Sequence, residues 1–183
     1  MRHPADDERL TVMGLLAETW AGLTALTAAQ LAEHGLGDME FEVLLRLARS
    51  PEGRLRMTDL AAQTSLTSSG ITRVVDRLVQ AGSLSREACT TDRRTTYAVL
   101  SDAGRERLGA ALPGHIELLE RWVVGPLTPE ALASFVECLR VLRDGVRPCA
   151  EAGAGGTAGT ARRAAVLADG SELRETAAPA TLG

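Results

Sequence analysis

A pair of short, capped helices constrains the fold more than any other feature of this chain. The first helix is predicted over 58–63, where Thr58 is a suitable N-cap. Thr67 is an N-cap for the second helix, over 68–81. Gly82 follows at the position where helices commonly end in a left-handed residue. Two short helices joined by only a few residues are typical of a helix-turn-helix.

A β-hairpin is predicted directly after the helix pair. Its strands cover 84–89 and 95–100, and the turn between them reads Thr90-Thr91-Asp92-Arg93-Arg94. A short extended piece at 55–57 precedes the helix pair. A hairpin that follows a helix-turn-helix is a wing, so the pattern predicts a winged helix-turn-helix.

The second helix of the pair has a buried face and a polar face. Apolar residues spaced to bury the two helices against each other are Leu60, Ala61, Leu66, Ile71, Val75 and Leu78. The polar face carries short hydroxyl groups and two guanidinium groups, at Ser68, Ser69, Thr72, Arg73 and Arg77. Hydroxyl groups suit close contact with phosphates, and arginine binds guanine or phosphate through two hydrogen bonds. We therefore expect this helix to lie in a DNA major groove.

The turn of the hairpin is also a candidate DNA contact. Asp92, Arg93 and Arg94 lie at its tip, where two adjacent arginines repel each other. The negative potential of a minor groove attracts arginine, and Asp92 is placed to hold one guanidinium by a charge-assisted hydrogen bond. The alternative is an ordinary charged hairpin tip.

Long amphipathic helices are predicted on both sides of this unit. One covers about 8–33, and two more lie within about 101–147, with Ser101 and Thr128 as caps. Their apolar residues exceed what one small subunit can cover, so we expect a homodimer. The fold class is mainly α with a small β-hairpin wing, a winged helix-turn-helix plus a helical dimerisation region.

These elements define a domain organisation. Residues 1–150 are expected to form a single regulator domain, whose DNA-binding part covers about 54–100. Residues 151–183 are rich in Gly, Ala and Thr and are expected to form a disordered tail.

The distribution of charge is compatible with DNA binding, although the net charge is −4. Residues 51–100 carry 7 arginines against 5 acidic residues and are the only basic block of the chain. Binding needs a local positive surface rather than a positive total. All 20 basic residues are arginine, for which a compositional preference is the simpler explanation.

Other kinds of site and protein find little support. No uninterrupted apolar run approaches the ~20 residues of a membrane span, and the N-terminus is polar, so we expect a cytoplasmic protein with no membrane partner. Three cysteines without zinc spacing and three isolated histidines predict no metal site and no cofactor. Cys89 lies near basic residues that would favour a thiolate, but a half-buried strand cysteine is the simpler reading. Enzyme motifs such as GxGxxG, GxSxG and HExxH are absent, so we expect no enzyme.

The chain resembles the multiple antibiotic resistance regulators, the MarR family, over about 8–147. The stretches that carry the resemblance are Asp59-Leu60-Ala61, Gly70-Ile71-Thr72-Arg73-Val74-Val75-Asp76-Arg77-Leu78, Gly82-Ser83-Leu84-Ser85-Arg86, Asp92-Arg93-Arg94 and Leu100-Ser101-Asp102-Ala103-Gly104-Arg105. The resemblance implies a homodimer on double-stranded DNA with a palindromic operator, with Asp92 and Arg94 as the wing motif. It also implies release by a small, aromatic or phenolic effector.

The resemblance implies an effector pocket between the dimer helices and the winged part. Candidate ligand-binding residues there are Trp20, His34 and Phe41, although aromatic residues such as Trp20 and Phe41 more often belong to an ordinary core. The predicted function is thus a DNA-binding transcriptional regulator, a repressor released by a small ligand. The alternative is a winged-helix module for protein interaction or dimerisation without DNA binding.

Overall fold

The computed structural model describes residues 3–90 and 94–146. Its helices and strands follow in the order α1 (Glu8–Glu33), α2 (Asp38–Ala48), β1 (Arg54–Arg56), α3 (Met57–Thr64), α4 (Ser68–Gln80), β2 (Leu84–Ala88), β3 (Thr96–Leu100), α5 (Asp102–Leu119) and α6 (Pro129–Val146). Single 3₁₀ turns occur at Pro4–Asp6 and Pro51–Gly53, and a π-helical turn at Glu120–Val124 follows α5. The predicted fold class, mainly α with a small β wing, is confirmed. The tail predicted over 151–183 lies outside the described residues.

The wing belongs to a three-stranded antiparallel sheet with the order β1-β3-β2. The predicted hairpin is confirmed, since β2 and β3 pair from Leu84 opposite Leu100 to Ala88 opposite Thr96. The extended piece before the helix pair is a third strand, which pairs with the other edge of β3. Ala98 and Leu100 of β3 are buried, which anchors the sheet to the core.

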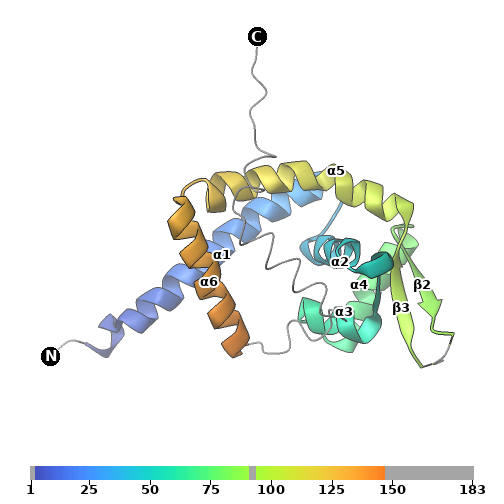
Figure 1. The fold of residues 1–183 in the computed structure, drawn as a ribbon, viewed down its shortest axis with the longest axis horizontal. Helices are drawn as coiled ribbons and strands as arrows, with labels where there is room; N and C mark the ends of the chain where they lie inside the picture. Colours follow the sequence, from blue (N-terminus) through green and yellow to red (C-terminus); the bar gives the residue numbers. More distant parts are fainter. Residues whose placement is uncertain (1–2, 91–93, 147–183) are drawn as a thin grey trace, which may run out of the picture.

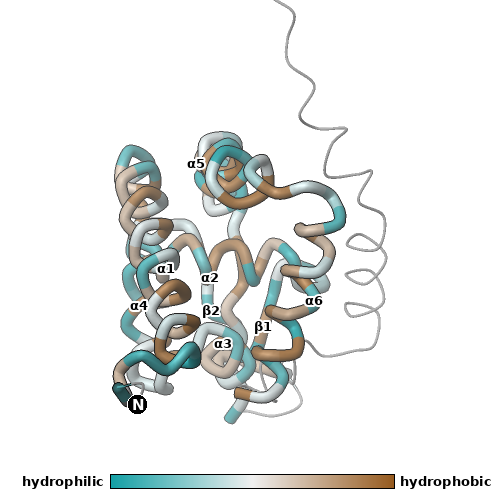
Figure 2. Tube along the Cα trace, turned by 90° about the vertical axis from the view of Figure 1, so that its left-hand side faces the viewer, coloured by the Kyte–Doolittle hydropathy of each residue, from teal (hydrophilic) through white to brown (hydrophobic). Residues whose placement is uncertain are grey.

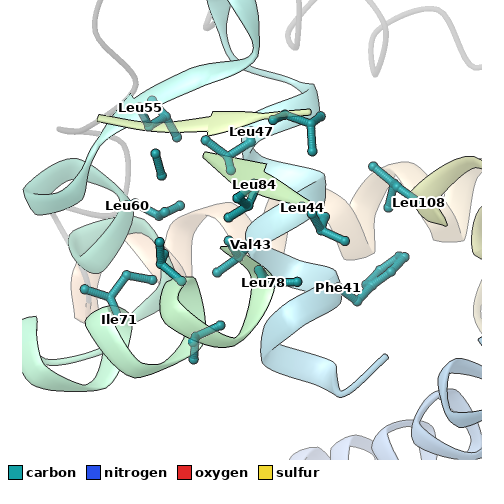
Figure 3. Close-up of a cluster of buried hydrophobic side chains, with 14 of the residues drawn as sticks. Phe41, Val43, Leu44, Leu47, Leu55, Leu60, Ile71, Leu78, Leu84 and Leu108 are labelled. Carbon is teal, nitrogen blue, oxygen red and sulfur yellow. The ribbon is translucent and has the colours of Figure 1, made fainter. Parts of the chain in front are cut away.

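A continuous hydrophobic core surrounds α2 (Figure 3). Val43, Leu44 and Leu47 of this helix are fully buried. Buried residues from α3, α4 and the sheet pack around them, among them Leu60, Ile71, Val75, Leu78 and Leu84. The winged part, defined as residues 38–100, therefore has its own core.

The remaining long helices form a helical frame, defined as α1, α5 and α6. Figure 1 shows α5 running from the wing across the molecule to the turn before α6, while α1 projects away from the winged part towards the N-terminus. The frame joins the core through Leu31 of α1 and through Leu108 and Ala111 of α5. Beyond these junctions many of its apolar residues are exposed and the others are only partly buried.

Exposed apolar residues are concentrated on the frame. Figure 2 shows the hydropathy along its helices. Trp20 of α1 is 71% exposed, and no residue of α6 is buried. Of the described helices, α1 also has the length and apolar composition of a membrane-spanning segment, although no uninterrupted apolar run marks it in the sequence. The frame thus presents a large apolar surface that residues 3–90 and 94–146 do not cover.

Most predicted helix boundaries are confirmed, and one cap is wrong. The Thr67 and Ser101 side chains accept hydrogen bonds from Gly70 N and Gly104 N, and Gly82 has a left-handed φ of 72°. Thr58, however, lies inside the first turn of α3, which begins at Met57. The reason is that Arg56 is still paired in β1, so strand and helix follow each other without a separate capping residue.

Candidate nucleic-acid interface

Helix α4 presents the predicted polar face to solvent. Its buried side is formed by Ile71, Val74, Val75 and Leu78. The opposite side exposes Ser68, Ser69, Thr72, Arg73 and Arg77. Thr67 caps the helix, and the Thr72 hydroxyl donates to the Ser68 carbonyl at 2.7 Å, which keeps it close to the helix surface. The first two turns of α4 are thus a rigid surface of hydroxyl groups and one guanidinium group, Arg73.

Helix α3 supports α4 from behind. The turn between them is possible because Ser65 adopts a left-handed conformation, with φ of 59°. Leu60 and Ala61 of α3 are buried, and small Ala61 lets the two helices approach closely, as the sequence predicts. The pair has the arrangement of a helix-turn-helix, in which one helix positions another at the surface.

Arg77, the last predicted contact along this face, is held by helix α2. Its Nε donates to Glu40 Oε1 at 2.8 Å, across 37 residues of sequence. Burial opposes ionisation of Glu40, but the hydrogen bonds from Arg77 and the Gly37 N–H, with the charges of Arg77 and Arg107, outweigh it and lower the pKa of Glu40. Arg77 therefore connects α4 to α2, a role that the sequence pattern did not indicate.

The wing is attached to α4 by Arg86 of β2. Its guanidinium forms an ion pair with Asp76 at 2.7 Å, and its Nη2 donates to the Thr72 carbonyl at 3.4 Å. Arg94 is exposed next to β3, on the same hairpin. Asp92 and Arg93, the other predicted contacts at the tip, lie outside the described residues. Arg86 had no predicted role of its own, because only the tertiary structure brings it next to α4.

The structure does not bring the three candidate effector-binding residues together at one site. Phe41 is buried and its ring lies 4.4 Å from the ring of His115, centroid to centroid, with an interplanar angle of 43°. His34 ends α1, and its carbonyl accepts from Arg107 Nε at 3.4 Å. Trp20 is exposed on α1 and contributes nothing to the core around Phe41. The structure therefore pairs Phe41 with His115, an isolated histidine for which the sequence indicated no partner.

A polar junction lies beside Phe41, where α1, α2 and α5 meet. Within residues 3–90 and 94–146, three buried side-chain atoms lack a hydrogen-bond partner: Gln30 Oε1, Asp38 Oδ1 and His115 Nδ1. Burial lowers the pKa of His115, although the negative charge of Asp38 opposes this shift. His115 is therefore neutral at pH 7, and the junction holds polar atoms able to bind a further group.

Comparison with known proteins identifies relatives of this arrangement. Residues 34–95 match the model of the MarR family. The chain is 36% identical to the HTH-type transcriptional repressor YetL of Bacillus subtilis over 59% of its own length. The aligned segment spans 64% of that repressor.

Two solved structures from Streptomyces coelicolor are also similar. One is Sco3205, a MarR family transcriptional regulator in complex with DNA, at 34% identity and a TM-score of 0.74, covering 81% of this chain and 92% of that one. The other is AbsC, a MarR family transcriptional regulator, at 30% identity and a TM-score of 0.74, covering 81% of this chain and 99% of that one. The similarity thus includes the frame as well as the winged part.

Proposed function

Because this chain belongs to the MarR family, we propose that it is a sequence-specific DNA-binding transcriptional regulator, a repressor released by a small ligand. The observation that carries the proposal is the exposed N-terminal face of α4 beside an arginine-bearing wing. A helix with hydroxyl and guanidinium groups at its N-terminal end suits the edges of bases in a major groove.

The DNA contacts divide between the helix and the wing. Ser68, Ser69, Thr72 and Arg73 reach base edges and nearby phosphates, with Arg77 at the far end of the same face. Arg94 enters the adjacent minor groove together with Arg93, and Asp92 orients a guanidinium there. The structure of the relative Sco3205 in complex with DNA supports DNA as the partner.

The acting form is a cytoplasmic homodimer on a palindromic operator. The exposed apolar residues of the frame support this, among them Leu10, Met13 and Leu16 of α1 and Phe135 and Leu139 of α6. A second copy that covers these residues explains why α1 is apolar without requiring a membrane. Two winged parts related by a two-fold axis then bind two half-sites.

The effector binds at the polar junction beside Phe41. An aromatic ring next to neutral His115 suits a small phenolic ligand, whose ring stacks on Phe41 and whose hydroxyl bonds to the imidazole. Of the candidate residues, buried Phe41 supports this site, whereas His34 at the end of α1 and exposed Trp20 stay predictions. The chain acts by binding and not as an enzyme.

A binding-site selection with the purified full-length chain tests the function. We expect enrichment of a palindromic sequence, and we expect phenolic compounds to release that DNA in a subsequent screen. A Phe41→Leu variant should keep the DNA affinity and lose the release. If the selection enriches no sequence, and Arg73→Ala and Arg94→Ala leave binding to random DNA unchanged, the chain is an interaction or dimerisation module.

A further inference from the structure

A hollow of about 360 Å³ lies between the start of α3, helix α4 and the wing. Three arginines reach it from three different elements: Arg56 from β1, Arg86 from β2 and Arg94 from the segment before β3. Its remaining lining consists of Met57, Thr58, Thr72, Thr95 and Thr96. Guanidinium and hydroxyl groups therefore predominate around the hollow, and no carboxylate is among the described residues that line it.

The arginines are held in place by contacts outside the hollow. Arg56 Nε donates to the Tyr97 hydroxyl at 3.3 Å, and Arg86 pairs with Asp76 at 2.7 Å. A guanidinium has five N–H donors, so one such contact fixes its orientation and leaves further donors for an anion. Asp76 and Asp59, the carboxylates near Arg86 and Arg56, do not outweigh the three positive charges.

The position of the hollow indicates which anion it binds. On a DNA duplex, a single sugar-phosphate strand separates a major groove from the adjacent minor groove. A protein that places a helix in one groove and a wing in the other must straddle that strand. The hollow lies between α4 and the wing, where the strand passes, and Thr72 of α4 is part of its wall.

We propose that this hollow seats one phosphodiester of the DNA strand between the two grooves, with Arg56 as its main ligand. The inference rests on the proposed function, and it adds Arg56, Thr58 and Arg86 to the residues that position DNA. Thr58 lies in the first turn of α3, where backbone N–H groups have no acceptor within the helix. These N–H groups are further hydrogen-bond donors for a phosphate in the hollow. A phosphate contact sets the register of the protein on DNA without reading sequence.

The test measures affinity for the selected DNA site with a neutral methylphosphonate placed at each phosphate in turn. For the wild-type protein we expect about a tenfold loss at one phosphate per half-site, between the positions contacted by α4 and by the wing. In Arg56→Gln the same substitution should cost less than about twofold, because the charge that bound this phosphate is gone. Arg56→Lys should retain most of the sensitivity. The slope of log affinity against log salt should also fall by about 0.9 per subunit in Arg56→Gln.

Arg54→Gln is the matched control. Arg54 is on the same strand as Arg56, and its substitution removes the same charge. Its guanidinium stacks over the Tyr97 ring at 4.3 Å and pairs with Glu52 and Glu87, and it does not line the hollow. We expect its sensitivity to each methylphosphonate to equal that of the wild type. The proposal is overturned if Arg56→Gln keeps the wild-type pattern of sensitivity to methylphosphonates. It is also overturned if Arg54→Gln becomes insensitive at the same phosphate as Arg56→Gln. Failure of the wild-type protein to select any DNA would instead overturn the proposed function, and the seat with it.

Discussion

The winged part and the helical frame differ in how far their apolar residues are buried. In α4, four residues are buried, whereas α6 has the same kind of amphipathic sequence and buries none. The winged part surrounds α2 mainly with its own residues, and Leu31, Leu108 and Ala111 of the same chain add to this core. The frame joins that core through Leu31 near one end of α1 and through Leu108 and Ala111 in the middle of α5. The difference teaches that the winged part packs within the described residues, whereas the frame leaves apolar residues exposed for the second copy that we propose.

The largest expected effect is in the core of the winged part. Leu44 is fully buried, so Leu44→Ala should lower the free energy of unfolding by about 2–5 kcal/mol. The loss should be the same at all protein concentrations, because this core needs no partner. Chemical denaturation at two concentrations measures it. A loss under about 1 kcal/mol, or one that depends on protein concentration, would contradict the contrast between the winged part and the frame.

Charges placed on α6 should separate the subunits without unfolding the winged part. Phe135 and Leu139 are each 40% exposed and lie one turn apart. The double variant Phe135→Asp, Leu139→Asp should be monomeric by light scattering and bind palindromic DNA at least about 100-fold more weakly, because two linked half-sites gain affinity from avidity. Ser134→Asp, on the same helix, is the control and should remain dimeric. A variant that stays dimeric would place the interface elsewhere.

Variants of the two proposed DNA-contacting surfaces, α4 and the wing, should differ in their effects on affinity and on sequence preference. Arg73→Ala should cost about 1–3 kcal/mol on the selected site and relax the sequence preference, since base discrimination depends on α4. Arg94→Ala should weaken binding with no loss of preference beyond that for A·T pairs. Titration against the selected site, a mismatched site and random DNA distinguishes them, with Arg46→Ala, paired with Glu42 on α2, as a control. If Arg73→Ala and Arg94→Ala lose the same affinity on all three DNAs, α4 and the wing do not have different roles in binding.

The smallest effect concerns the ion pair that joins α2 to α4. Glu40→Gln should lower the free energy of unfolding by up to about 1 kcal/mol at pH 7, because one partner, Arg77, is largely exposed. The pKa of Glu40 is lower in the folded chain than its ordinary value of 4.5, so its contribution is present above that pH and is lost as the pH falls through the folded pKa. In thermal unfolding, the difference between the two proteins at pH 7 should therefore shrink as the pH falls below 4.5. A constant difference would mean that the charge of Glu40 contributes nothing.

The elements whose signals are local could be predicted from the sequence. Thr67 and Ser101 cap their helices through a backbone N–H three residues away, and Gly82 ends α4 with a conformation that glycine adopts at no steric cost. Helix periodicity likewise predicted the buried side of α4 and therefore its exposed polar face. These features require only neighbours within a few positions, which the order of residues specifies directly.

The site became complete only in three dimensions. The pairs Glu40–Arg77 and Asp76–Arg86, the contact of Phe41 with His115, and the gathering of Arg56, Arg86 and Arg94 around one hollow all join residues from different elements. No spacing rule specifies them, because β1 must first pair with β3, and α2 must first pack behind α4, before these side chains come within reach. The sequence by itself determined which helices and strands form and which residues they expose. Only the tertiary structure decided which of those residues act together, because long-range packing brings them to one place.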